Sequence, residues 1–233
     1  MRPQRTNVLW KKKQPENARA VTPPRPQDDF AIIQQFNQLY MKVRAWSVEF
    51  VGGAVGSELS AQQVTLLRRL VLSNLDLAEV LADKTLHRHV IEGVIGIAIA
   101  EMLSSKTPSD TNALSETIYG QVTGFATSKT PMKELKNDLG AILAMAVSLQ
   151  KSFATQTATF TVSYPRVQDG QCEFQTAMME DKSNGKNGGP SKRLVGLLIF
   201  PGMFKVAEGV RTCMVKIKVI CTDEMARYNV KVA

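Results

Sequence analysis

The sequence predicts an α+β fold: a disordered, basic, proline-rich amino-terminal arm, a mostly helical first half with one early strand, and an antiparallel β-rich second half. Three observations support this. Basic residues and prolines crowd residues 1–27, apolar residues recur at helical spacing across 28–151, and apolar and polar residues alternate across much of 153–233. With 44% apolar and 21% charged residues, the 233-residue chain has enough material for a core and is not disordered as a whole. We expect residues 28–233 to form one globular domain.

The first 27 residues hold three quarters of the formal net charge of +8. Seven basic residues stand there against one acid, which gives +6, whereas the remaining 206 residues carry +2. Five of the ten prolines lie in the same segment. A segment of this composition buries too little apolar surface to offset the entropy of ordering it, so we predict a mobile cationic arm. Its basic residues are Arg2, Arg5, Lys11, Lys12, Lys13, Arg19 and Arg25.

Cationic arms of this kind bind polyanions, either nucleic acid through counterion release or an anionic lipid surface. Trp10, beside three lysines, adds an indole that stacks on a base or lies at the headgroup interface. The same composition also suits a solubilising tail or a nuclear import signal. We predict that the arm is a polyanion-binding site with Trp10 as a stacking or interfacial residue, and the choice between lipid and nucleic acid stays open.

A second, smaller basic site is predicted in the polar, glycine-rich stretch from residue 181 to residue 193. It lacks the G-x-x-x-x-G-K-[ST] order of a phosphate-binding loop, and a strand pattern follows it. A hairpin loop is therefore expected, whose cations either bind polyanions or are simply solvated. These cations are Lys182, Lys186, Lys192 and Arg193.

The helical half begins at Asp28 and Asp29, which are typical of a helix start, and apolar residues continue at helical spacing to Leu39. Residues 43–51 then alternate, which predicts the early strand. A capping box of Ser60 and Gln63 opens a helix expected to run to residue 82.

A central helix is predicted over residues 86–103, where Gly93 and Gly96 permit close packing against a neighbour. A weaker helix is expected over 114–125. The last helix is expected to begin at Thr130-Pro131, with proline at the first helical position.

The second half predicts strands at residues 157–164, 194–200 and 211–222, with a turn and strand at 169–179. In the 211–222 strand, Cys213 and Cys221 are expected to face inward, with Lys216 and Lys218 outward. Three cysteines without zinc-finger spacing indicate reduced thiols in a cytosolic or nuclear setting.

No residue set points to a catalytic step. His87 and His89 stand two apart, so on a helix they do not share a face and make a poor metal pair; we expect surface or partly buried structural histidines. The nucleophile-elbow, zinc-protease and paired-carboxylate motifs are missing. We therefore expect no catalytic residue, no metal and no cofactor, and a protein that is not an enzyme.

A membrane span is not expected either. The longest uncharged apolar stretch, residues 93–100, is far shorter than the roughly 20 residues of a transmembrane helix. The first 15 residues lack the apolar core of a secretory signal. These patterns predict a soluble or membrane-peripheral protein.

The order of these elements resembles that of rhabdovirus matrix proteins, particularly those of plant-infecting members. The basic arm, the strand at 43–51, the helices at 60–82 and 86–103, and the later strands follow the order expected of that family. The Pro23-Pro24-Arg25-Pro26 stretch lacks the tyrosine of the P-P-x-Y budding motif found in many animal-virus members.

The resemblance implies a structural virion protein that bridges the viral ribonucleoprotein and the anionic membrane surface and condenses the nucleocapsid by self-association into homo-oligomers. It implies RNA binding and a location in the virion and the host cytoplasm, and Trp10-Lys11-Lys12-Lys13 would add import into the nucleus.

Two other classes stay open. A nucleic-acid-coating protein, such as a capsid or nucleocapsid subunit or an RNA silencing suppressor, shares the arm but needs a basic groove in the body, for which a net +2 offers little. An enzyme of unrecognised type would need a pocket of clustered ionisable groups.

Overall fold

The computed structural model describes residues 28–50, 59–72, 75–105, 110–123, 131–183 and 193–223. Within these residues, helices come first along the chain and strands follow, which confirms the α+β class. The helices are α1 (Asp29–Phe50), α2 (Ala61–Arg68), α3 (Leu77–Ala82), α4 (Lys84–Ser104), α5 (Thr111–Val122) and α6 (Met132–Ala154). The strands are β1 (Thr159–Ser163), β2 (Met179–Asp181), β3 (Arg193–Phe200), β4 (Gly202–Ala207), β5 (Val210–Val215) and β6 (Ile217–Asp223).

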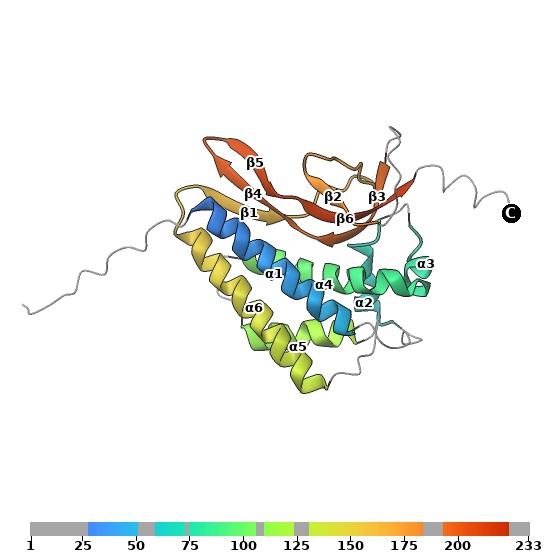
Figure 1. Ribbon diagram of the computed structural model, residues 1–233. Helices are drawn as coiled ribbons and strands as arrows, with labels where there is room; N and C mark the ends of the chain where they lie inside the picture. Colours follow the sequence, from blue (N-terminus) through green and yellow to red (C-terminus); the bar gives the residue numbers. More distant parts are fainter. Residues whose placement is uncertain are drawn as a thin grey trace, which may run out of the picture.

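The molecule has a layer of strands packed on a layer of helices (Figure 1). Helix α4 packs against β3 and β1, and α1 packs on α4 and on the edge of β5. Helices α5 and α6 lie on the far side of α1 and α4 from the strands. Phe36 and Tyr40 of α1 meet Phe200 of β3, with ring centroids 5.7 and 4.9 Å apart, so aromatic packing joins the two layers.

The strands form two three-stranded sheets. One has the order β1-β4-β5 and is antiparallel throughout; the other has the order β2-β6-β3. Strands β3 and β6 are antiparallel, but β2 runs parallel to β6, which is an exception to the predicted antiparallel half. All residues of β3 after Arg193 are buried, as expected for its continuous apolar run.

Two helical glycines let α4 lie directly on β3, which confirms the close packing against a neighbour that was expected of them. A Cβ added at Gly93 would lie 2.8 Å from the Leu198 carbonyl oxygen and 2.9 Å from the Leu70 side chain. One added at Gly96 would lie 3.0 Å from the Pro201 ring and would also meet the Tyr164 hydroxyl. Any side chain at Gly93 or Gly96 would therefore push the helix away from the sheet.

The early strand predicted at 43–51 is wrong, because residues 43–50 continue α1. The apolar residues there fit both the alternation of a strand and the spacing of a helix. The residues that are buried are those at helical spacing. Val43, Trp46 and Ser47 lie inside, whereas Val48 is 52% exposed. The Trp46 indole N–H donates to the Leu135 carbonyl oxygen of α6 at 2.9 Å, which fixes this end of α1.

The helix predicted from Ser60 to residue 82 is two helices, α2 and α3. Its start is confirmed, since Ser60 and Gln63 form the capping box. After α2 the chain pairs with β3: the Leu72 amide donates to the Gly196 carbonyl at 2.8 Å, and the Leu198 amide donates to the Leu70 carbonyl at 2.9 Å. The pairing with the sheet replaces the helical hydrogen bonds and ends α2.

The strand predicted at 211–222 is also two strands. It breaks at Lys216, so that Cys213 lies on β5 in one sheet and Cys221 on β6 in the other. Lys218, predicted to face outward, is buried, and the Glu180 carboxylate of β2 pairs with its ammonium. Pro131 is the residue before α6 and not its first residue.

His87 and His89, expected to be surface or partly buried structural histidines, are both buried in α4. A ring nitrogen of His87, Nε2, lies 2.7 Å from the Leu81 carbonyl oxygen.

Candidate functional site

Most of the predicted polyanion-binding residues lie outside the described part of the chain. These are the seven basic residues of the arm, Trp10, Lys186 and Lys192. Lys182 and Arg193 are described. Lys182 directly follows β2 and Arg193 opens β3, so the fold places them on the two outer strands of one sheet with β6 between them.

Both of these cations contact acids of the same chain. The Lys182 ammonium pairs with Glu180, and the Arg193 guanidinium pairs with Asp181 and lies 5.3 Å from the Phe174 ring centroid. Burial raises the pKa of the Asp181 carboxyl, but hydrogen bonds from Ser183, Cys221 and Arg193 outweigh it and hold that pKa below its usual value. The positive charge of Lys182 and Arg193 is thus largely balanced within the sheet.

A larger charged cluster, which sequence reasoning missed, surrounds Tyr40 where α1, α4 and the sheet meet. The Tyr40 ring packs on Phe200, and the Lys218 ammonium lies 5.7 Å from the Tyr40 ring centroid. Burial, followed by the charge of Glu92, raises the pKa of the Tyr40 hydroxyl to about 12. We call this group the Tyr40 cluster; its members are Tyr40, Arg44, Arg88, Glu92, Glu180 and Lys218.

Glu92, a member of the Tyr40 cluster, is fully buried. Its carboxylate lies 3.3 Å from Arg88 Nε and 3.4 Å from His89 Nδ1, and it accepts a hydrogen bond from the Ser47 hydroxyl at 3.3 Å. A buried carboxylate needs such partners, because an uncompensated charge inside a protein costs several kcal/mol. Glu92 therefore joins α4 to α1 through polar contacts at the edge of an apolar core.

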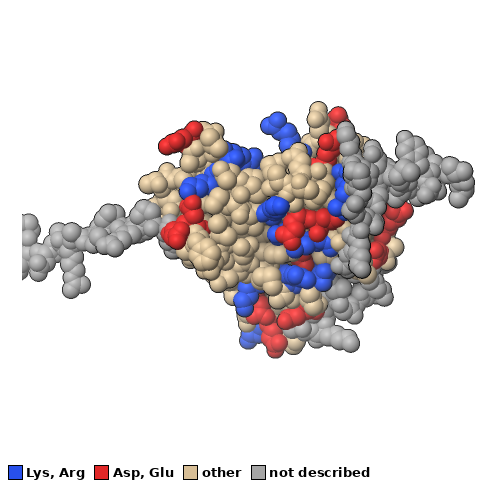
Figure 2. All heavy atoms as spheres, turned by 45° about the horizontal axis from the view of Figure 1, so that its top comes forward, with Lys and Arg blue, Asp and Glu red and all other residues tan. Residues whose placement is uncertain are grey.

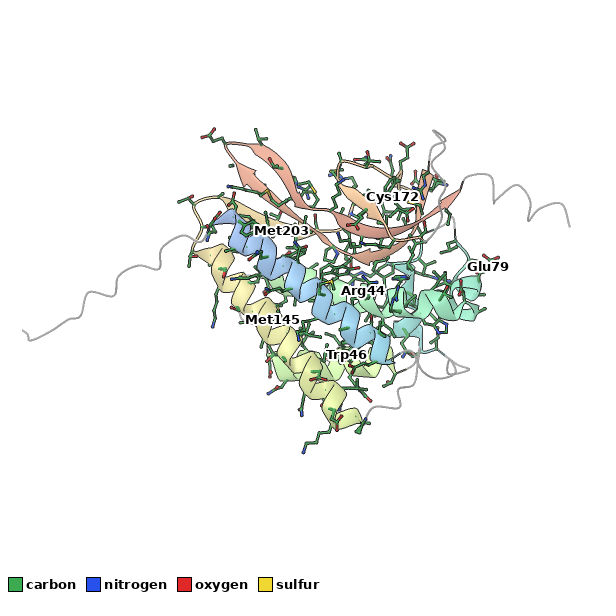
Figure 3. All side chains as sticks on the ribbon, in the orientation of Figure 1. Arg44, Trp46, Glu79, Met145, Cys172 and Met203 are labelled. Carbon is green, nitrogen blue, oxygen red and sulfur yellow. The ribbon has the colours of Figure 1, made fainter. Side chains whose placement is uncertain are left out.

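Glu180 of β2, another member of the Tyr40 cluster, lies between two lysines. Both Lys182 and Lys218 pair with its carboxylate. Burial raises the pKa of Glu180, but the two lysines lower it by more, so that Glu180 stays ionised. Figure 2 shows basic and acidic groups side by side near the middle of the face it presents, and Figure 3 marks Arg44, which is exposed. This arrangement holds the helices on the sheet, and Arg44 lies at its exposed edge.

A polar cleft of about 780 Å³ lies between the two sheets, bordered by the segment from Tyr164 to Gln175. Its charges are mixed, since Arg166 and Arg211 stand with Asp169 and Glu173. Cys172, marked in Figure 3, is buried at its wall. Burial raises the pKa of the Cys172 thiol, which makes it a packed thiol and not an activated nucleophile.

The charge of the described residues is close to balance. They carry 16 basic and 18 acidic side chains, a net charge of −2. The residues outside the described ranges carry 13 basic and 3 acidic side chains, a net charge of +10. All of the chain's net positive charge therefore lies outside the part that the structure describes.

The described residues lack two further kinds of site. No group of three or more His, Cys, Asp or Glu side chains among them is arranged to hold a metal ion. None of their helices combines the length and apolar character needed to cross a membrane. Comparison of the chain with known protein families, with curated proteins and with solved structures found no match.

Proposed function

We propose that this chain is a self-associating structural protein that binds polyanions through its basic arm, residues 1–27, and bridges an anionic membrane surface and a ribonucleoprotein as matrix proteins do. The observation that carries this proposal is the division of charge. The arm holds +6, whereas the described part of the chain holds −2.

Because the positive charge is divided in this way, we expect the arm to supply most of the binding energy. Near an anionic lipid surface each lysine or arginine contributes about 1 kcal/mol, and on nucleic acid each neutralised phosphate releases condensed counterions. The described part of the chain, with a net charge of −2, adds no general attraction to a polyanion. Binding should therefore weaken steeply as salt is added.

A bridge between two polyanionic surfaces needs more than one arm in one assembly. A single arm engages one surface weakly and reversibly, whereas several arms held together bind with avidity. Contacts between folded bodies would supply that assembly. The proposed function therefore joins two properties, salt-sensitive binding by the arm and association of the bodies.

Flotation with vesicles that contain about 30% phosphatidylserine tests the arm. We expect the full chain to float at low salt, and deletion of residues 1–27 to abolish flotation without changing the circular dichroism spectrum of the remaining chain. A matched pair of full-length variants removes three charges each: Lys11, Lys12 and Lys13→Gln in the arm, and Lys133, Lys151 and Arg166→Gln on exposed positions of the body.

The arm triple should lose at least half of the floated fraction and the body triple should float like the wild type. Equal loss in both triples would show that net charge alone matters and would overturn the assignment to the arm. If the full chain binds single-stranded RNA but no vesicle, membrane bridging is refuted and a nucleic-acid-coating protein takes its place.

A further inference from the structure

We propose that the exposed face shared by α1 and α6 is the surface through which this chain binds a second copy of itself. The inference rests on the self-association in the proposed function and names its site. We call this surface the α1–α6 face; it holds a shallow groove of about 550 Å³ lined by Gln34, Asn37, Gln38, Met41, Lys42, Ala45 and Met145.

The two helices lie side by side and antiparallel (Figure 1). The Trp46 indole of α1 bonds the Leu135 carbonyl near the start of α6, and near the other end the Ser152 hydroxyl lies 3.3 Å from Gln35 Oε1. These contacts hold α1 and α6 together along their length. Helices α1 and α6 thus form a rigid pair. Figure 3 labels Trp46, which is buried in their contact, and Met145, which lines the groove.

Charge is missing from the first half of α1 and from the later part of α6. Residues 30–41 of α1 and residues 139–150 of α6 contain no Asp, Glu, Lys or Arg. Nine of these 24 residues are buried, and at the chain's 21% charged content the other 15 would carry about three charges. Figure 2 shows a largely uncharged strip between the charged groups at the left of the molecule and those at its lower tip. Depletion of charge at the centre of a patch is a compositional mark of protein–protein interfaces.

Large apolar side chains are exposed along the same helices. Of six such side chains in the described residues, four lie on α1 and α6: Phe30, Met41 and Val48 on α1, and Met132 on α6, each more than half exposed. Phe30, Met41 and Val48 follow one another at spacings of 11 and 7 residues, about three and two helical turns, so they share one face of α1. Methionine is enriched at interfaces because it adapts to irregular surfaces.

The polar residues of the groove decide which partner fits. Gln34, Asn37 and Gln38 are exposed, and each amide carries both a donor and an acceptor. An amide therefore pairs with an identical amide across a twofold axis, which a lysine or a glutamate does not do. Burial of these amides in lipid would leave them without partners, and the single lysine of the groove offers little to a polyanion. A second copy of the chain is the partner that satisfies this surface.

The size of the face sets the strength of the contact. Twelve helical residues extend about 18 Å, and a packed helix pair is about 20 Å wide, which gives about 400 Å² of flat area. A standard stable interface takes about 800 Å² from each partner. The expected contact is therefore weak and concentration-dependent, and it gains its effect from the avidity of several arms.

Sedimentation velocity of the full chain over a concentration series tests the surface. We choose about 0.5 M NaCl, where charge contacts of the arm are screened and apolar and amide contacts persist. Met41→Lys places like charges across the twofold axis, and we expect it to raise the dissociation constant at least tenfold. Val210→Lys is the matched control, because Val210 is equally exposed and apolar but lies on β5.

Val210→Lys should associate like the wild type. A mixture of Met41→Lys and Met41→Glu should associate more strongly than either variant alone, since opposite charges then meet. Ala144→Glu, on an exposed position of α6, should weaken association as well. Circular dichroism checks that each variant is folded.

The inference is overturned if the wild type stays monomeric at every concentration, or if Met41→Lys and Val210→Lys behave alike. Its failure is separable from failure of the proposed function. Loss of vesicle and RNA binding at low salt with association intact refutes the bridging role and leaves the interface standing. Polyanion binding without any association refutes the interface alone.

Discussion

The contact between α4 and β3 can be tested with a pair of glycine-to-alanine substitutions. Gly93→Ala places a methyl group 2.8 Å from the Leu198 carbonyl oxygen and 2.9 Å from the Leu70 side chain, closer than ordinary van der Waals contact. Gly140 of α6 is the matched control, because a Cβ there meets no atom within 4 Å. Both glycines lie inside α-helices, so the backbone effect of the two substitutions is the same.

The expected magnitudes follow from these distances. Alanine is favoured over glycine inside a helix by about 0.5–1 kcal/mol, and Gly140→Ala should raise the free energy of unfolding by that amount. Gly93→Ala gains the same term but loses about 1–3 kcal/mol to overpacking, because a backbone oxygen yields less readily than a side chain. We therefore expect Gly93→Ala to be about 1–3 kcal/mol less stable than Gly140→Ala.

Urea unfolding followed by circular dichroism measures both variants against the wild type. The midpoint should move down for Gly93→Ala relative to Gly140→Ala with an unchanged m value, since the surface exposed on unfolding is the same. If Gly93→Ala were as stable as Gly140→Ala, α4 would not lie against β3 as closely as the structure has it, and the packing argument would be refuted.

Two further predictions concern polar contacts. Burial raises the pKa of Asp181, but its hydrogen bonds lower it by more, so the ionised carboxyl stabilises the fold above its unfolded pKa of about 3.9 and this stabilisation is lost as the pH falls through the lower folded-state pKa. Urea unfolding from pH 7 to pH 2.5 should therefore show a smaller acid-side loss of stability in Asp181→Asn than in the wild type; parallel curves would contradict the assigned pKa direction. Trp46→Phe removes the hydrogen bond to Leu135 and part of a buried ring, and should lower the free energy of unfolding by about 1–3 kcal/mol. Circular dichroism is the probe, because Trp46 is one of only two tryptophans; an unchanged midpoint would show that the bond contributes nothing.

Local chemistry predicted the places where elements begin better than where they end. The capping box at Ser60 and the acidic start at Asp28 depend on neighbours within three residues, so the sequence shows them directly. The end of α2 depends on β3, more than a hundred residues away, because the Leu72 amide bonds the Gly196 carbonyl. The strand wrongly predicted at 43–51 has the same origin: which of two apolar periods is buried is decided by α6 and α4.

The candidate site was predictable only in part. The charge of the arm is a property of composition, and it is visible in the sequence. The Tyr40 cluster joins α1, α4, β2 and β6, and the buried state of Lys218 depends on Glu180, 38 residues earlier in the chain. The Lys218 ammonium lies near the Tyr40 ring of α1, and pairing with β2 brings the Glu180 carboxylate that allows its burial.

The two proposed contacts differ in their sensitivity to salt, and this difference limits the conditions under which a bridge exists. Arm contacts with phosphates weaken steeply as salt rises, whereas association through the uncharged α1–α6 face depends on apolar and amide groups that salt hardly screens. At low salt both contacts form and surfaces are joined. At high salt the bodies stay associated while their arms release the polyanion. Bridging should therefore be lost at the salt concentration at which the arms dissociate from the polyanion. This concentration is lower than the one at which the associated bodies would dissociate from each other.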